Sequence, residues 1–237
     1  MAVAKCWCLI EMQNKFERWR RALLKHLLVL SIGLFPMLAV HGEGLDAGKE
    51  LKALLAPINS ISAEFRQQLY SADDYLIQDG SGRMRLATPG KMRWLLDSPM
   101  EQWLISDGET LWLYDPDLEQ VIIKPFDPDV AAVPALILSG SVDDLSAAYE
   151  ISLSSTSDFT PASEQSQSFT LTPRDQQTFY EYLRFDFEDN KPVALTIVDA
   201  LGQRTQIVFS LVVLNEEIAP ELFTFEVPPG VDVIRDE

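Results

Sequence analysis

Residues 101–115 read Glu-Gln-Trp-Leu-Ile-Ser-Asp-Gly-Glu-Thr-Leu-Trp-Leu-Tyr-Asp, with apolar runs on both sides of Asp107-Gly108. Both residues of this dipeptide tolerate the positive φ angles of a two-residue type I′ turn, so the stretch is predicted to form a β-hairpin. The pairs that this turn implies are Trp103 with Trp112, Ile105 with Thr110 and Leu104 with Leu111. Because side chains alternate along a strand, the first two pairs share one face and the third lies on the other.

Neither face of this hairpin is polar. A hairpin with one face in water would carry polar residues at every second position, and residues 101–115 do not. We therefore expect both faces to be covered, one by the protein's core and the other by an apolar ligand. The face of Trp103 and the face of Leu104 are both candidates for the ligand side.

Residues 1–42 have the pattern of a secretory signal peptide. The apolar run Leu27–Val40 has the length of a signal-peptide core and is too short to span a bilayer. The basic residues ahead of it are Lys15, Arg18, Arg20, Arg21 and Lys25. Cleavage is expected after Gly42, with Met12 as an alternative start and an uncleaved anchor as the alternative interpretation. Residues 43–237 then form a single domain with a sizeable core.

The chain is strongly acidic, which bears on its partners. Its formal net charge is −17. Residues 43–237 alone hold 13 Lys and Arg and 34 Asp and Glu, a net charge of −21. Such a charge disfavours binding to nucleic acid and to anionic membrane surfaces, and it favours solubility in an aqueous compartment. No nucleic-acid partner is therefore expected.

Histidine and cysteine occur only in the first 42 residues. These residues are Cys6, Cys8, His26 and His41. A mature chain without them cannot build a Ser-His-Asp site, a Cys-His site or a common zinc site. Paired carboxylates of the glycosidase type remain an option, although 34 acidic side chains form pairs by chance and none lies in a known motif. We therefore expect a protein that is not an enzyme and uses no metal or cofactor.

The rest of the chain shows the two-residue period of β-strands. Residues 45–56 are predicted to form an amphipathic helix that ends before Pro57. The strands predicted outside the hairpin cover residues 58–70, 75–85, 91–96, 120–124, 149–153, 168–173, 178–188, 192–199 and 203–214. Nine to eleven antiparallel strands at short, regular spacing predict one curved sheet or an open barrel.

The period changes at residues 127–140, which read Asp-Pro-Asp-Val-Ala-Ala-Val-Pro-Ala-Leu-Ile-Leu-Ser-Gly. A proline in the first turn, an apolar cluster and a terminal glycine predict a short hydrophobic helix. Such a helix is too short to be stable alone and must lie on an apolar surface. Residues 143–148 are expected to add one more helical turn.

Several motifs, in order along residues 45–233, resemble the outer-membrane lipoprotein carrier family, LolA. The longest is the hairpin itself, Leu104 to Pro116. The others are Leu51-x-x-Leu54-Leu55 followed by Phe65-x-Gln67, then Pro89-x-x-Met92-x-Trp94, Val198-Asp199-Ala200-Leu201-Gly202-Gln203 and Phe223-x-Phe225-x-x-Pro228-Pro229-Gly230-Val231. No single motif carries the resemblance alone.

The resemblance implies a fold, a cargo and a set of partners. The implied fold is mainly β with α: a half-open barrel of one curved antiparallel sheet, closed by a helical lid. The implied role is that of a monomeric periplasmic carrier, which binds the acyl chains of lipoproteins between sheet and lid. The cargo would come from an inner-membrane ABC-type release complex and pass to the outer-membrane receptor LolB.

The candidate residues for the lipid cavity are apolar and lie on the hairpin, the third strand and the short helix. They are Met92, Trp94, Trp103, Trp112, Leu136, Ile137 and Leu138. Large aromatic residues in strands belong to the core about as often as to a cavity wall, and the family position of Met92 and Trp94 favours the wall for those two. The three helix residues are expected to contact either the sheet or the acyl chains.

One position departs from the family pattern. Members of the family commonly have an arginine just before the proline of the third-strand turn, and it hydrogen-bonds to lid backbone in the closed state. This chain has Thr88 at that position. A neutral hydroxyl makes a bond about half as strong as a charge-assisted one, so a more easily opened lid is expected. A neighbouring basic residue could substitute, the candidates being Arg83, Arg85, Lys91 and Arg93.

A second interpretation is a periplasmic lipid-sensing regulatory domain related to RseB. That regulator has a similar half-barrel followed by a second domain, for which residues 43–237 leave no room. LolB itself shares the fold but begins at a lipidated cysteine, and none follows the apolar run here.

Overall fold

The computed structural model describes residues 46–126, 138, 145–154, 165–175 and 180–235, and residues 43–237 form one compact unit. The predictions for the signal peptide and for a helix at 127–140 fall outside these residues, apart from Leu138. Two α-helices lie in the described part, α1 (Ala47–Leu55) and α2 (Leu145–Ala148). None of the helices among these residues is both long and apolar enough to cross a membrane.

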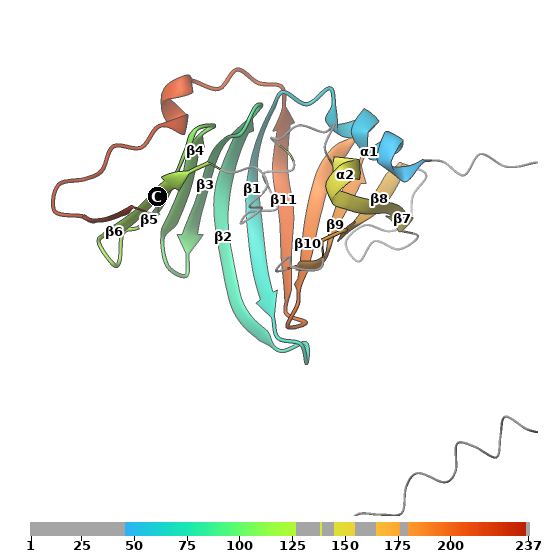
Figure 1. Ribbon diagram of the computed structural model, residues 1–237, viewed down its shortest axis with the longest axis horizontal. Coiled ribbons are helices and arrows are strands. Elements are labelled where there is room, and N and C mark those ends of the chain that lie inside the picture. The colour runs from blue at the N-terminus through green and yellow to red at the C-terminus, as the bar shows by residue number, and fades with distance from the viewer. Residues whose placement is uncertain (1–45, 127–137, 139–144, 155–164, 176–179, 236–237) are drawn as a thin grey trace, which may run out of the picture. The chain divides into compact units, whose positions relative to one another are not determined.

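Twelve strands of the described residues form one sheet, curved as Figure 1 shows. Along the chain they are β1 (Ser60–Tyr70), β2 (Leu76–Ala87), β3 (Lys91–Ser98), β4 (Gln102–Asp107), β5 (Thr110–Asp115), β6 (Gln120–Pro125), β7 (Tyr149–Ser154), β8 (Ser166–Pro173), β9 (Tyr180–Glu188), β10 (Lys191–Asp199), β11 (Arg204–Leu214) and β12 (Asp232–Arg235). Their order in the sheet is β12-β6-β5-β4-β3-β2-β1-β11-β10-β9-β8-β7. The prediction of a mainly β protein with one curved antiparallel sheet is confirmed.

The last strand is the exception to both the predicted count and the predicted direction. β12 is parallel to β6, whereas every other described pair is antiparallel. It has only four residues, all exposed, and follows Pro228-Pro229-Gly230. A strand so short and so exposed has no alternation that sequence reasoning could detect.

The predicted pairing of the 101–115 hairpin is wrong by two residues. The observed pairs are Trp103 with Tyr114, Leu104 with Leu113, Ile105 with Trp112 and Ser106 with Leu111. The cause is Asp107, whose Oδ1 accepts hydrogen bonds from the backbone N–H groups of Glu109 (2.8 Å) and Thr110 (2.7 Å). This Asx turn lengthens the loop to four residues. A shift of two residues leaves every side chain on its predicted face, so the expectation of two apolar faces is unaffected.

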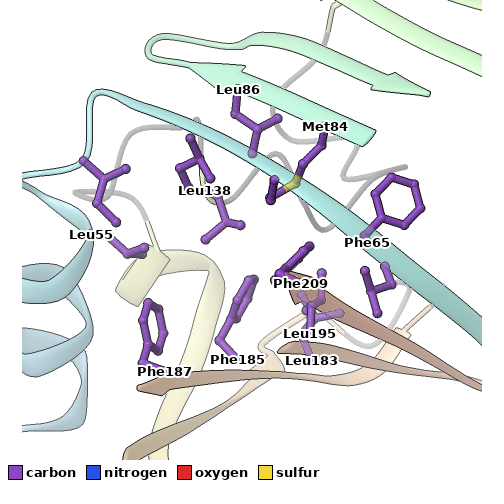
Figure 2. Packing of buried hydrophobic residues seen from close by; sticks show 14 of the residues in the cluster. Leu55, Phe65, Met84, Leu86, Leu138, Leu183, Phe185, Phe187, Leu195 and Phe209 are labelled. Carbon is purple, nitrogen blue, oxygen red and sulfur yellow. The ribbon is translucent and has the colours of Figure 1, made fainter. Parts of the chain in front are cut away.

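The inner face of the sheet carries the main core. Leu51 and Leu55 of α1 are buried against it, and Asp46 caps the helix by accepting from Lys49 N. Figure 2 shows Leu138 in the space between Leu86 on β2 and Phe185 on β9. Other buried members come from eight strands: Ile61, Phe65, Met84, Met92, Trp94, Leu96, Leu111, Phe169, Leu171, Leu183, Phe187, Leu195, Ile207 and Phe209.

A smaller apolar cluster lies on the outer face of β3 to β6. Leu95, Ile105, Val121 and Ile123 are buried there, although none belongs to the inner core. The C-terminal segment that covers them contains the 3-10 helix η2 (Pro220–Phe223) and Phe225, and it contacts β3 and β4. We call residues 220–235 the strap. Figure 1 shows it passing along the β3–β6 side of the sheet to β12.

Candidate functional site

Part of the inner face is not filled by core side chains. It holds a hollow of about 620 Å³. The residues that line it are Gln67, Leu69, Trp94, Leu96, Gln102, Leu104, Leu111, Leu113, Ile122, Lys124, Tyr180, Ile197, Asp199, Gln203, Thr205 and Ile207. These residues come from β1, β3 to β6, β9 to β11 and the β10–β11 turn, so the hollow exists only because the sheet curves.

The wall formed by β3 to β6 is mostly apolar. Trp94 lies on β3, at the side of this wall next to β2, and stacks on Phe65 of the neighbouring core, with ring centroids 4.1 Å apart. Gly82 makes this contact possible: it pairs with Phe65, and a Cβ there would lie 2.6 Å from Phe65 Cζ and 2.0 Å from Leu95 O. The missing side chain lets the Phe65 ring reach across β2 to Trp94. The indole is thereby held in place by the core while its other side meets the hollow.

Polar groups gather at one end of the strands that form the other side of the hollow. Gln67, Tyr180, Asp199, Gln203 and Thr205 lie where β1 and β10 end and where β9 and β11 begin, which is one end of these antiparallel strands. Asp199 Oδ1 accepts from the N–H groups of Leu201 (2.8 Å) and Gln203 (2.9 Å), so this carboxylate holds the β10–β11 turn. Burial, and to a lesser degree Tyr149, raises the pKa of the Tyr180 phenol, which therefore remains a neutral hydroxyl.

The structure places two of the predicted cavity residues on the opposite face. Strand alternation and the observed pairing put Trp103 and Trp112 on the outer face together with Ile105. Trp103 contacts Tyr114 and Phe225 edge to face, at centroid distances of 5.5 and 6.3 Å. The face of Leu104 is the one that lines the hollow. The two indoles are therefore removed from the set of candidates for the wall.

The remaining candidates fall into three groups. Trp94 lines the hollow. Met92 and Leu138 are buried in the inner core, outside the hollow's lining. Leu136 and Ile137 lie outside the described residues. The candidates that the sequence missed are chiefly Leu96, Leu111, Leu113 and Ile122, whose inward parity could have been read from the strand alternation once the inner face was known.

Within the described residues, Thr88 makes no hydrogen bond across the inner face of the kind that the family arginine makes to lid backbone. Its N–H donates to Asn59 O at 3.0 Å and its hydroxyl lies 3.4 Å from the same oxygen, in the turn between α1 and β1. The four basic residues that could replace the family arginine lie on the outer face. Arg83, Arg85, Lys91 and Arg93 share the outer parity, opposite Met84, Leu86, Met92 and Trp94.

Arg93 instead ties the strap to the outer face. Its guanidinium donates to Leu222 O at 3.1 Å and lies 5.4 Å from the centroid of the Trp103 ring. Burial is the main cause that lowers the pKa of Arg93, and the nearby cations Arg85 and Arg83 add to it. A cation that is partly desolvated in this way gains more from a carbonyl and an aromatic face than an exposed one does.

The chemistry of the site is that of a binding hollow. Among the described residues there is no group of three or more His, Cys, Asp or Glu side chains that could hold a metal ion. The one carboxylate in the lining, Asp199, is engaged by backbone N–H groups. Apolar walls with a few polar groups at one end suit an elongated amphiphilic ligand.

Comparison with known proteins identifies the family. The model of the outer membrane lipoprotein carrier protein LolA matches residues 56–226. This chain belongs to the LolA family. An outer-membrane lipoprotein carrier protein from Chromohalobacter salexigens is 39% identical over 208 residues, covering 87% of this chain and 96% of the relative. One from Pseudomonas aeruginosa is 36% identical over 214 residues, covering 90% and 99%.

Solved structures with a related fold are much more distant in sequence. A LolA superfamily protein from Nitrosomonas europaea is 13% identical, with a TM-score of 0.45 over 76% of this chain and 98% of that one. The complex of MucA and MucB from Pseudomonas aeruginosa contains a chain that is 16% identical, with a TM-score of 0.46 over 76% of this chain and 61% of that one.

The contact of Arg93 with the strap can be tested by substitution. Arg93→Met keeps the aliphatic stem but removes the donor to Leu222 and the cation over Trp103. Hydrogen bonds to charged groups are worth about 1.5–3 kcal/mol, so amide exchange in residues 221–225 is expected to be faster by about tenfold or more. The matched control is Arg83→Met, which loses only an exposed ion pair with Asp97 worth about 1 kcal/mol or less. Equal protection of the strap in both variants would contradict this role of Arg93.

Proposed function

We propose that the protein carries lipoproteins through the periplasm with their acyl chains in the hollow. One observation carries the proposal: in a member of the LolA family, the apolar wall formed by Trp94, Leu96, Leu104, Leu111, Leu113 and Ile122 borders unfilled space on the inner face. The names of the relatives support the same cargo. In this proposal the cargo comes from an inner-membrane ABC-type release complex and passes to LolB.

Transfer requires that the cargo be covered incompletely. Each buried methylene is worth about 0.8 kcal/mol, so roughly 45 methylenes of three long chains would contribute about 36 kcal/mol if fully buried. Non-covalent affinities stop near about 18–21 kcal/mol. A hollow of about 620 Å³ fits a carrier that binds its cargo loosely and releases it to a tighter receptor.

The helix expected at residues 127–140 is proposed to form the lid over this hollow. Leu138 supports the idea, because it is buried in the inner core between strands from both halves of the sheet. Among the described residues, the lining of the hollow contains no His, Cys or Ser side chain. A lipid-sensing domain of the RseB type is the weaker alternative, because the family match and both relatives cover most of this chain as carriers.

The lid should open readily, because Thr88 bonds to Asn59 where the family commonly has an arginine. Hydrogen exchange measured across residues 127–145 is expected to be faster than global unfolding in the free protein and slower once lipid is bound. Protection of these amides at the level of global unfolding in the free protein would rule out an easily opened lid.

The assignment of faces predicts a sharp difference between neighbouring residues. Leu104→Gln introduces a polar group into the apolar wall and is expected to weaken binding of a dansyl-labelled triacylated lipopeptide by about tenfold, since an amide buried without a partner costs on the order of 1–3 kcal/mol. Trp103→Leu alters the outer face and should leave the affinity within about twofold.

Leu118→Gln is the matched control, because Leu118 is 68% exposed in the β5–β6 turn. Binding should be measured by fluorescence titration after circular dichroism has shown that each variant is folded. If Trp103→Leu lowered the affinity as much as Leu104→Gln, the hollow would not be the lipid site.

A further inference from the structure

The two flanks of the hollow differ in chemistry. On β3 to β6, six of the eight lining residues are apolar; on β1 and β9 to β11, only Leu69, Ile197 and Ile207 of the eight are aliphatic. The other five are the polar residues at the strand ends described above. A purely hydrocarbon ligand would gain nothing from these groups and would desolvate them.

The donors of this polar end lie close together on neighbouring strands. Leu69 pairs with Thr205 and Gln67 pairs with Ile207, so Gln67 and Thr205 are diagonal neighbours on β1 and β11. Gln203 lies just before β11, and its backbone N–H donates to Asp199 Oδ1, which fixes its position. All three side chains are half-buried, and among the described residues none of the three is engaged in a side-chain hydrogen bond. They offer amide N–H and hydroxyl groups to a ligand.

We propose that Gln67, Gln203 and Thr205 bind the ester and amide carbonyls through which acyl chains are joined to the glyceryl-cysteine of a lipoprotein. This inference rests on the proposed function and specifies which part of the cargo the polar end recognises. A carbonyl that enters the hollow without a donor loses its hydrogen bonds to water, whereas a donor in the wall replaces them. The acyl chains then extend from the polar end across Trp94 toward Leu111.

The charge at this end favours a neutral linkage over an anionic headgroup. Asp199 is the only charged lining residue on this flank, and Lys124 lies on β6, at the opposite end of the strands. A free fatty-acid carboxylate or a phosphodiester placed at Gln203 would be repelled by Asp199. Ester and amide carbonyls accept the same hydrogen bonds without that repulsion. The polar end therefore selects acylated glyceryl-cysteine over phospholipids and free fatty acids.

A carbonyl-deletion experiment tests this directly. The probes are a synthetic triacylated lipopeptide with ester-linked chains and its analogue in which ether links replace both esters, with chain lengths unchanged. The proteins are residues 43–237 without substitution and the Thr205→Val and Gln67→Leu variants, each with its fold checked by circular dichroism. Thr110→Val is the matched control, because Thr110 has the outer-face parity of Trp112. Affinities are measured by isothermal titration calorimetry.

The unsubstituted protein is expected to bind the ester probe about fivefold more tightly than the ether probe, because one neutral hydrogen bond contributes about 1 kcal/mol. Thr205→Val and Gln67→Leu should each reduce that ratio of affinities toward one, because they weaken binding of the ester probe only. Thr110→Val should leave the ratio unchanged. Equal affinity of the unsubstituted protein for both probes would overturn the inference while leaving the carrier function standing. Failure to bind either probe would overturn the carrier function and the inference with it.

Discussion

The structure depends on how both apolar faces of the sheet at β3 to β6 are kept out of water. Strands β3 to β6 carry large apolar side chains on both sides, and the outer side is closed by the strap through Arg93, Trp103 and Phe225. With that side covered, the inner side can be left partly unfilled without exposing both faces of the same strands. An unfilled apolar face costs free energy, and the outer cluster and the helix-covered core offset it.

The core and the hollow share one continuous surface. Phe65 belongs to the core and Trp94 to the wall, and their stacking joins the two regions across Gly82. Leu51 and Leu55 of α1 and Leu145 of α2 pack into the core, and the polar strand ends border the hollow. This gradient from packed core to apolar wall to polar rim is the order of groups in a lipid with long chains and a polar head. A sheet with this gradient could fold and, as proposed, also hold a loosely bound amphiphile.

Sequence reasoning found the sheet because period-two alternation is a local property of strands such as β9 and β11. It also placed the hairpin side chains on the correct faces, since a register error of two residues does not change parity. It failed where long-range contacts decide. Nothing in the hairpin says which face the strap covers, so both faces stayed open and Trp103 and Trp112 remained among the candidates for the wall. The Asx turn at Asp107 was missed because Asp-Gly is equally compatible with a tighter turn.

The same limit applies to the polar end of the hollow. Gln67, Gln203 and Thr205 are unremarkable in sequence, and only the pairing of β1 with β11 brings them together. The direct test of a carrier is what it holds in its compartment. Native mass spectrometry of the protein isolated from cells depleted of the proposed outer-membrane receptor should show a complex with a triacylated lipoprotein, and the Leu104→Gln variant should retain less of it. A chain that is recovered without lipidated cargo under those conditions would contradict the carrier function.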